Sequence, residues 1–197
     1  MSNTLIIYCH PYDKSFSHAV LSEALKPLAH NQTGYRLLDL YADNFNPIYD
    51  EQELQLYASG ATTDPLVTRY LAALKEADQL IIITPIWWND LPAMLKGFFD
   101  KVMKRGPELA YTSTSRGVAG HLDNIKSALV LTTSTSPTVY QRLFCGDAIK
   151  RILIGATLKQ LGIQNVKWHN FGGITAATVE KRRTYLTHVG QWVNRLS

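Results

Sequence analysis

Apolar residues gather in five short runs along the chain, and most of the stretches between these runs show helical periodicity. Runs that are apolar throughout are typical of strands covered on both faces of a parallel sheet. The predicted strands are residues 4–9, 35–40, 79–84, 128–133 and 166–171. A first helix is predicted to begin near residue 17, and four more are predicted at 66–77, 92–104, 147–161 and 178–195.

Alternation of strands and helices favours an α/β fold, in which a doubly wound parallel sheet lies between two layers of helices. No period repeats and no low-complexity linker divides the chain, so residues 1–197 are expected to form a single domain. Residues 44–63 are expected to be irregular, with room for a short helix at 51–57. Pro27 should end or kink the first helix, and Gly162 should follow the end of the fourth.

Composition narrows the classes of function. The net charge is +4, and the basic clusters at 101–105 and 181–183 are expected to be solvated helix faces rather than a nucleic-acid surface. The longest apolar run, residues 5–9, is too short to cross a membrane, and no signal peptide is visible. The two cysteines form neither a disulfide framework nor a zinc pair, and the six histidines lack metal-ligand spacing. We therefore expect a cytoplasmic protein without a metal.

Ligands of doubly wound sheets bind beyond the carboxyl ends of the strands, so the loops after those ends carry the candidate chemistry. The loop after the first strand holds His10, Ser15 and Ser17 and leads into a helix N-terminus. Free N–H groups and the helix dipole favour an anion there, and two hydroxyls can hydrogen-bond a phosphate. In the alternative interpretation, Ser17 is a plain N-cap. The patterns GxGxxG and GxxxxGKS/T are absent, which disfavours a dinucleotide-binding Rossmann site and a P-loop.

The loops after the third and fourth strands add aromatic and polar surface. Trp87 and Trp88 can stack on a flat aromatic ligand, or they can serve in packing. Hydroxyl-bearing residues 132–136 can donate hydrogen bonds to the polar edge of a ring. Tyr140 lies just beyond, where its phenol can share a proton with a reduced ring or simply pack. Together the three loops describe a pocket for a phosphorylated flat heterocycle, for which a flavin is the obvious candidate.

Several motifs match one known family. The matching pieces are His10-Pro11, Ser15-Phe16-Ser17, Asn46-Pro47, Pro85-Ile86-Trp87-Trp88, the segment 92–102, Ala110-Tyr111-Thr112, Thr132-Thr133 and Tyr140. With them the chain resembles the flavodoxin-like NAD(P)H:quinone oxidoreductases, which include mammalian DT-diaphorase and small bacterial flavoproteins. The resemblance reaches about residue 171, and residues 85–102 are its most specific part. It implies a five-stranded parallel sheet in the order 2-1-3-4-5, FMN or FAD as cofactor, NAD(P)H as co-substrate, and a homodimer with sites at the interface.

The resemblance also implies roles for individual residues. The positions that hold the flavin phosphate are matched by His10, Ser15, Phe16 and Ser17. The stretch along the isoalloxazine ring is matched by Pro85, Ile86, Trp87, Trp88 and Asn89. The loop at the pyrimidine edge is matched by Thr132, Thr133, Ser134 and Thr135. The expected catalytic residue is Tyr140, and Tyr111 matches an aromatic that closes the pocket from the partner subunit. The substrate is then expected to contact Tyr111, Trp87 and Tyr140.

The chain departs from the family at several of these positions. Ser134-Thr135 stands where the family often has Gly-Gly, which narrows backbone freedom at that turn. Cys145 stands in place of a histidine of the mammalian enzymes, so a Tyr–His proton relay is not expected. Ser113 replaces a second pocket tyrosine, and substrate preference is therefore expected to differ.

The family implies a two-step reaction. A hydride passes from NAD(P)H to the flavin, and two electrons then pass to a quinone or similar acceptor in the same pocket, with ping-pong kinetics. The alternative is a flavoprotein regulatory subunit of a potassium-efflux transporter. A one-electron carrier is disfavoured by the charge of +4, because such carriers usually present an acidic face. A chain that has kept the fold without binding flavin is a fourth interpretation.

Overall fold

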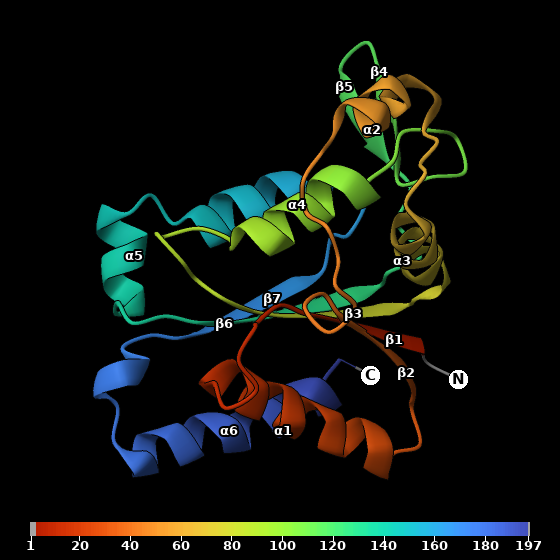
Figure 1. Cartoon of the computed structure of the whole chain (residues 1–197). Coiled ribbons are helices and arrows are strands. Elements are labelled where there is room, and N and C mark those ends of the chain that lie inside the picture. The colour runs from red at the N-terminus through yellow and green to blue at the C-terminus, as the bar shows by residue number, and fades with distance from the viewer. Residues whose placement is uncertain (1–2, 197) are drawn as a thin grey trace.

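The computed structural model describes residues 3–196 and shows a parallel sheet between two layers of helices (Figure 1). The sheet consists of β1 (Asn3–Tyr8), β2 (Gly34–Asp39), β3 (Gln79–Pro85), β6 (Ser127–Thr133) and β7 (Val166–Phe171). They pair in the order β2-β1-β3-β6-β7, and each pair is parallel. These are the five predicted strands in the predicted order, so the expected flavodoxin-like α/β fold is confirmed.

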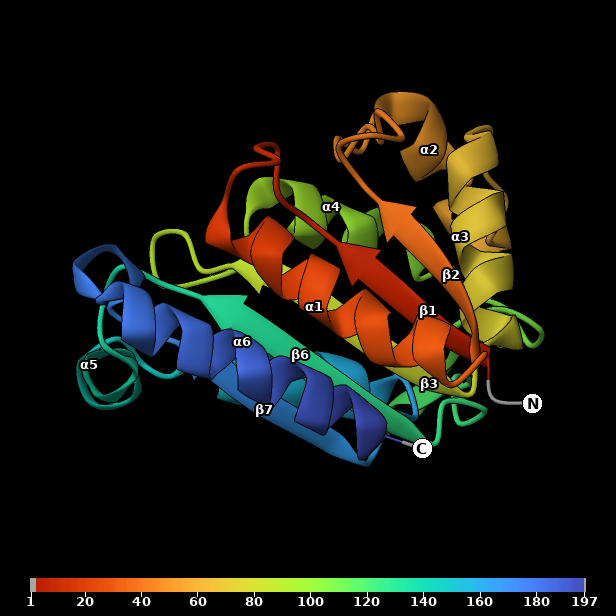
Figure 2. The same ribbon diagram turned by 90° about the horizontal axis from the view of Figure 1, so that it is seen from below.

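Helices cover both faces of the sheet. One face carries α1 (Phe16–His30) and α6 (Val179–Asn194), which lie side by side in Figures 1 and 2. The other face carries α3 (Pro65–Glu76), α4 (Ala93–Val102) and η2 (Ile149–Leu158). Alternate residues of a strand point to opposite faces, so Leu5 and Ile7 of β1 pack under α3 and α4, while Ile6 and Tyr8 pack against α1. Burial on both faces explains why the central strands β1, β3 and β6 are apolar without alternation, whereas the edge strands β2 and β7 are partly exposed and carry polar residues.

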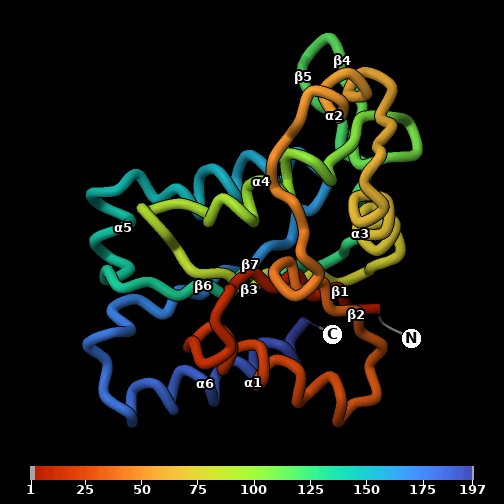
Figure 3. Tube along the Cα trace, viewed as in Figure 1, coloured from red at the N-terminus to blue at the C-terminus, as the bar shows by residue number. Residues whose placement is uncertain are grey.

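At the amino ends of the strands, hydrogen bonds attach the chain that follows α6 to β3 and β6. The carbonyl oxygen of Leu196, just beyond α6, accepts hydrogen bonds from the Gln79 side chain and the Ser127 hydroxyl. Both ends of the described chain lie near this edge in Figure 3. The opposite, carboxyl edge is therefore the one left for loops.

The predicted fourth helix is present but has a different geometry. η2 is a π-helix, whose hydrogen bonds run from residue i to residue i+5. Its buried side chains recur every four or five residues, at Ile149, Leu153, Ile154 and Leu158, and this wider turn gathers them on one side. After the helix, the N–H of Ile163 donates to the carbonyl of Leu158 and Gly162 has φ 105°, which is the expected glycine stop.

Other sequence predictions need correction. Pro27 does not end α1, which continues to His30; only one turn follows it, and its carbonyl still accepts the N–H of Asn31. In the irregular segment, the short helix α2 (Glu51–Gln55) is present, followed by the 3₁₀ turn η1 (Tyr57–Ser59). Four further elements were not predicted from the sequence. These are the hairpin β4 (Tyr111–Thr114) and β5 (Gly117–Gly120), the helix α5 (Thr138–Phe144) and the turn η3 (Ile174–Ala176).

A buried ion pair ties the irregular segment to the chain beyond α4. Lys104 Nζ lies 2.7 Å from Glu53 Oε2, and both side chains are only 2% exposed. The carboxylate also accepts hydrogen bonds from the Thr62 hydroxyl and the Thr63 N–H. Burial by itself would raise the pKa of Glu53, but the Lys104 and Thr hydrogen bonds and the Lys104 charge hold it at about 2. Glu53 is therefore charged at neutral pH, and its position depends on Lys104.

A second cation strengthens this attachment. Lys101, on the buried side of α4, donates to Asp64 at 3.0 Å and to the Asn46 carbonyl at 2.8 Å. Lys101 thus holds both ends of the segment 46–64, and Lys104 holds Glu53 within it. The basic residues near 101–105 include these two buried ones, which corrects the expectation of a purely solvated face.

No helix among residues 3–196 combines the length and the apolar character that a membrane span requires.

We expect Lys104→Met to lower the free energy of unfolding by about 3–5 kcal/mol, because it leaves the Glu53 carboxylate buried without its counter-charge. Chemical denaturation at neutral pH measures this change. The matched control is Lys96→Met in α4, since Lys96 pairs with Asp100 at the exposed surface, and it should cost less than about 1 kcal/mol. Equal losses in the two variants would contradict this account of the segment.

Candidate active site

The carboxyl ends of β1, β3 and β6 enclose a crevice with a volume of about 180 Å³. Its walls come from three loops far apart in sequence. It is lined by His10, Ser15, Phe16, Ser17, Pro85, Ile86, Trp87, Thr133, Ser134, Thr135 and Ile174. Every member of this set except Ile174 was a candidate from the sequence. The structure therefore brings most of the predicted site residues to one place.

The first wall is the N-terminus of α1. Ser15 is the N-cap and accepts the N–H of His18 at 3.1 Å, so the interpretation of Ser17 as the N-cap is wrong. Ser17 is buried in the first turn, with its Oγ 2.9 Å from the Thr133 hydroxyl oxygen, which joins α1 to β6. The first turn holds no acidic residue. Its N–H groups and dipole therefore suit an anion such as a phosphate.

His10 stands beside this turn in a defined protonation state. Its Nδ1 accepts the N–H of Tyr12 at 3.1 Å, so the proton of the neutral ring lies on Nε2. Burial lowers the pKa of His10, and the nearby His18 lowers it further. The ring meets Trp87 edge to face, with centroids 6.1 Å apart. His10 thus links the anion-binding wall to the aromatic wall as a neutral hydrogen-bond donor.

The aromatic wall is a tight two-residue turn. Trp87 and Asp90 exchange backbone hydrogen bonds of 3.0 and 3.1 Å across it. The two central residues, Trp88 and Asn89, have φ of 49° and 66°, the left-handed pair of a type I′ turn. A bulky side chain rarely adopts this conformation, and Trp88 is also 98% exposed. An indole held in an unfavourable backbone conformation and in water points to a role outside packing.

The polar wall depends on one side chain that the sequence analysis missed. Asn170 of β7 accepts a hydrogen bond from the Thr132 hydroxyl and donates to the hydroxyls of Ser134 and Thr138, each at 2.9 Å. Thr132 is fully buried, also accepts the indole N–H of Trp168, and does not line the crevice. Its contribution is to hold the loop that carries Ser134. The predicted strand 166–171 also holds Lys167 and His169, so no local pattern singled out Asn170.

A second cavity, of about 300 Å³, continues from the crevice. The two share Ile86, Ser134 and Thr135, and the second adds Trp88, Asn89 and Tyr140. Tyr140 lies on α5, half exposed, and stacks on Phe144 with ring centroids 5.6 Å apart. The joined cavities thus place an anion-binding end, two tryptophans and a phenol along one continuous surface.

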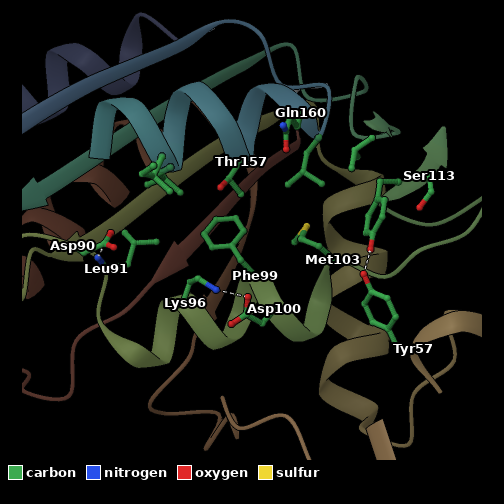
Figure 4. Close-up of a pocket in the computed structure, with 15 residues that line it drawn as sticks. Tyr57, Asp90, Leu91, Lys96, Phe99, Asp100, Met103, Ser113, Thr157 and Gln160 are labelled. Carbon is green, nitrogen blue, oxygen red and sulfur yellow. Dashed lines mark hydrogen bonds and ion pairs between the residues drawn. The ribbon is translucent and has the colours of Figure 1, made fainter. Parts of the chain in front are cut away.

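Tyr111 lies outside the crevice and the second cavity. It lines a separate cavity of about 330 Å³ between α4 and η2, with Phe99 and Met103 (Figure 4). Its hydroxyl is 2.7 Å from that of Tyr57, and burial together with this hydrogen bond raises the pKa of Tyr111 to about 12. Within one chain, Tyr111 is therefore not part of the crevice that holds the other predicted residues.

Among the described residues, no three His, Cys, Asp or Glu side chains are grouped so that they could hold a metal ion. The crevice itself offers N–H groups, hydroxyls and aromatic surface. These groups fit a flavin with a phosphate tail.

Sequence comparison places the chain among oxidoreductases. Residues 2–196 match the family described as Flavodoxin-like fold. The chain is similar to an uncharacterized NAD(P)H oxidoreductase of Haemophilus influenzae, with 28% identity over 190 residues, covering 96% of this chain and 93% of the relative. It is also similar to NAD(P)H dehydrogenase (quinone) 1 of Cavia porcellus, with 30% identity over 160 residues. That match covers 71% of this chain but only 56% of the mammalian protein.

Comparison with solved structures gives the same result as the sequence comparison. An NAD(P)H:quinone oxidoreductase from Methanothermobacter marburgensis has a TM-score of 0.88 and 26% identity, covering 100% of this chain and 99% of the other. An FMN-dependent NADH-azoreductase from Bacillus anthracis, in complex with FMN, has a TM-score of 0.82 at 22% identity, covering 100% and 99%, and shares the fold. This chain therefore belongs to the flavodoxin-like family of NAD(P)H:quinone oxidoreductases, a family of enzymes.

Proposed function

We propose that the chain, residues 1–197, is one flavin-binding domain that acts as an FMN-dependent NAD(P)H:quinone oxidoreductase with ping-pong kinetics. The observation that carries the proposal is the crevice where the N-terminus of α1, the Trp87–Trp88 turn and the Ser134–Thr135 loop meet. The names of the relatives support the reductant and the quinone-like acceptor, and the fold neighbour with FMN supports the cofactor. Bound flavin supplies the hydride acceptor and the two-electron donor.

Different residues of this chain bind the phosphate, the ring and the polar edge of the flavin. The first turn of α1 with Ser15 and Ser17 holds the phosphate through N–H groups and hydroxyls, without a charged side chain. Trp87 and the backbone of Pro85 and Ile86 lie along the ring, and the Ser134–Thr135 loop borders its polar edge. Tyr140 donates its phenolic proton toward the reacting edge, where developing negative charge is stabilised.

We also propose that the active form is a homodimer. Trp88, which lines the second cavity, is exposed, and so are the apolar side chains Val139, Leu143 and Phe144 of α5, the helix that carries Tyr140. Such surface is unusual for a monomer and suits a second copy of the chain. In that arrangement, Tyr111 of one subunit closes the pocket of the other, as the resemblance implies. The regulatory role on a potassium-efflux transporter has no observation of its own in its favour.

With the FMN-loaded protein, double-reciprocal plots for NADPH at several benzoquinone concentrations should be parallel, because one pocket serves both substrates in turn. Steady-state assays under nitrogen measure this. Intersecting lines would contradict the shared pocket. Absence of any turnover by protein that has bound FMN would favour the regulatory role instead.

Replacing Trp88 should separate binding from stability. Trp88→Gly should leave the free energy of unfolding unchanged or raise it by about 1 kcal/mol, because glycine tolerates the left-handed conformation and an exposed indole contributes no packing. FMN affinity and the kcat/KM for the quinone should fall several-fold. The control Asn89→Gly relieves the same turn and keeps the indole, so it should retain most of the activity. A large loss of stability in Trp88→Gly would show that the indole is a packing residue.

Leu143→Glu should convert the dimer into a monomer, because a charge on the apolar face of α5 cannot be buried without a partner. Light scattering coupled to gel filtration measures the mass. Tyr35→Glu, an exposed aromatic on edge strand β2, is the control and should remain dimeric. A wild-type protein that is monomeric at high micromolar concentration would refute the dimer.

A further inference from the structure

A chain of hydrogen bonds with a fixed direction runs from β7 toward α5. The indole N–H of Trp168, which can only donate, donates to the Thr132 hydroxyl at 2.8 Å. Thr132 is fully buried, and its hydroxyl has one other partner among the described residues, the Asn170 side chain at 2.9 Å. The Thr132 proton is therefore donated to Asn170, and the atom that accepts it is the amide oxygen Oδ1. The amide nitrogen Nδ2 is left to face the loop after β6 and the helix α5.

The remaining side-chain partners of Asn170 all accept from Nδ2. The Ser134 hydroxyl donates its own proton to the Ser136 carbonyl at 2.8 Å and accepts from Nδ2 at 2.9 Å. Thr138 Oγ1 accepts at 2.9 Å, and Gln141 Oε1 accepts at 3.3 Å. The two protons of Nδ2 serve three acceptors, so one proton is shared between two of them. A donor turned toward Nδ2 would meet another donor, which fixes the orientation of each partner.

This direction decides which end of the Gln141 amide is free. Oε1 is turned toward Asn170, so the amide nitrogen Nε2 and its two protons are turned elsewhere. Nε2 has no hydrogen-bond partner among residues 3–196, and it is not sealed from solvent as the Tyr8 hydroxyl is. Gln141 is only 7% exposed and lines the second cavity, so these protons are available to a ligand there.

The second cavity suits a neutral acceptor on a flat ring. No charged side chain of the described residues lines it, and Trp88 supplies aromatic surface. A carbonyl oxygen in the plane of a ring accepts N–H protons near that plane, which matches a primary amide held at the cavity wall. An amide does not titrate, so this donor is present at every pH at which the protein is folded.

We propose that Gln141 donates its Nε2 protons to a carbonyl oxygen of the ligand in the second cavity, and that Asn170 is the positioning residue that keeps these donors turned toward it. The proposal rests on the proposed function, which brings a flavin ring and a quinone to this place. Both carry ring carbonyls, and both gain negative charge on reduction, which a fixed donor stabilises. Measurements on FMN and on a quinone separate the two sources.

Two substitutions of Gln141 separate a donor to the ligand from an acceptor for Asn170. Gln141→Met keeps the length but neither polar group, and it should weaken ligand binding roughly three- to tenfold, the effect of one lost hydrogen bond. Gln141→Glu keeps the oxygen that accepts from Asn170 but presents a carboxylate to the cavity, so it should weaken binding more than Gln141→Met does. Fluorescence titration measures FMN affinity, and steady-state kinetics measures KM and kcat for duroquinone. Gln191→Glu, at an exposed position of α6, is the matched control and should behave as wild type.

The pH dependence and the ligand's infrared spectrum are readouts that a packing role would not change. Acidification that protonates the new carboxyl of Gln141→Glu makes it a donor again, so binding should recover toward wild type. Gln141→Met has no titrating group there and should show no recovery. In infrared difference spectra, the carbonyl stretch of the bound ligand should lie at lower frequency in wild type than in Gln141→Met, because a hydrogen bond weakens the C=O bond.

The source of the carbonyl follows from which ligand responds. If it belongs to the flavin, both substitutions of Gln141 weaken FMN binding and shift the FMN carbonyl bands. If it belongs to the acceptor, FMN binding is unchanged and KM for duroquinone rises, while the reduction of ferricyanide, which has no carbonyl, keeps its rate. Either result supports Gln141 as the donor.

Asn170→Asp tests the positioning role. A carboxylate at this position only accepts hydrogen bonds, so the Gln141 amide should turn its protons toward it and present Oε1 to the cavity. Asn170→Asp should therefore weaken ligand binding at least as much as Gln141→Met does. In the Gln141→Met background the same change should cost nothing further, because no donor is left to turn. Additive losses would contradict the positioning role.

The proposal is overturned if Gln141→Glu binds both ligands better than Gln141→Met at neutral pH, or if no carbonyl band differs between wild type and Gln141→Met. Should Gln141→Met fail to fold, Gln141→Glu and its pH dependence decide alone. Titration and infrared spectra need no turnover, so their outcome is independent of the proposed activity. A protein whose FMN bands shift but which reduces no quinone keeps this donor and loses the proposed function. A protein that reduces quinone equally in all variants, with unchanged bands, keeps the function and loses the donor.

Discussion

The sealing of both faces of the sheet is the constraint on which the rest of the molecule depends. Apolar side chains point from each central strand into two separate cores, so neither face can hold a polar ligand. All five strands run the same way, and their carboxyl ends meet at one edge. Polar groups that follow the strands, from His10 to Ser134, are thereby brought together although they lie far apart in the sequence.

Some unfavourable local features also lie at this edge. Trp88 and Asn89 occupy left-handed backbone conformations, and the Tyr8 hydroxyl is buried without a hydrogen-bond partner among residues 3–196. The opposite edge differs, because there the end of α6 is bound by the side chains of Gln79 and Ser127. Unfavourable conformations and unpaired groups are tolerated where the surrounding structure is rigid and a ligand can offset their cost.

The irregular segment 44–63 is held against the rest of the chain mainly by ion pairs rather than by regular secondary structure. It has little regular structure and few apolar residues to bury, yet it carries Tyr57 to the hydroxyl of Tyr111. Phe45 packs against Tyr70 and Phe98 at its start, and beyond that point the ion pairs of Lys104 with Glu53 and of Lys101 with Asp64 hold the segment. Such pairs contribute little net stability compared with apolar packing, but they permit one geometry only, since a buried charge cannot leave its partner cheaply. The position of Tyr57 against the β4–β5 hairpin follows from this attachment.

The sequence by itself determined the strands, most helices, the sheet order through family resemblance, and the loops that form the crevice. These follow from periodicity and from residue types that act locally, such as the apolar run in β1 or the serines at the start of α1. Only the tertiary structure decided that Thr132 is buried beneath Asn170, that Tyr111 lies apart from Tyr140, and that Lys104 faces Glu53. It also decided the β4–β5 hairpin, α5 and the π geometry of η2. Each of these depends on contacts between residues distant in sequence, and no local pattern encodes which partner a side chain meets once the chain is packed.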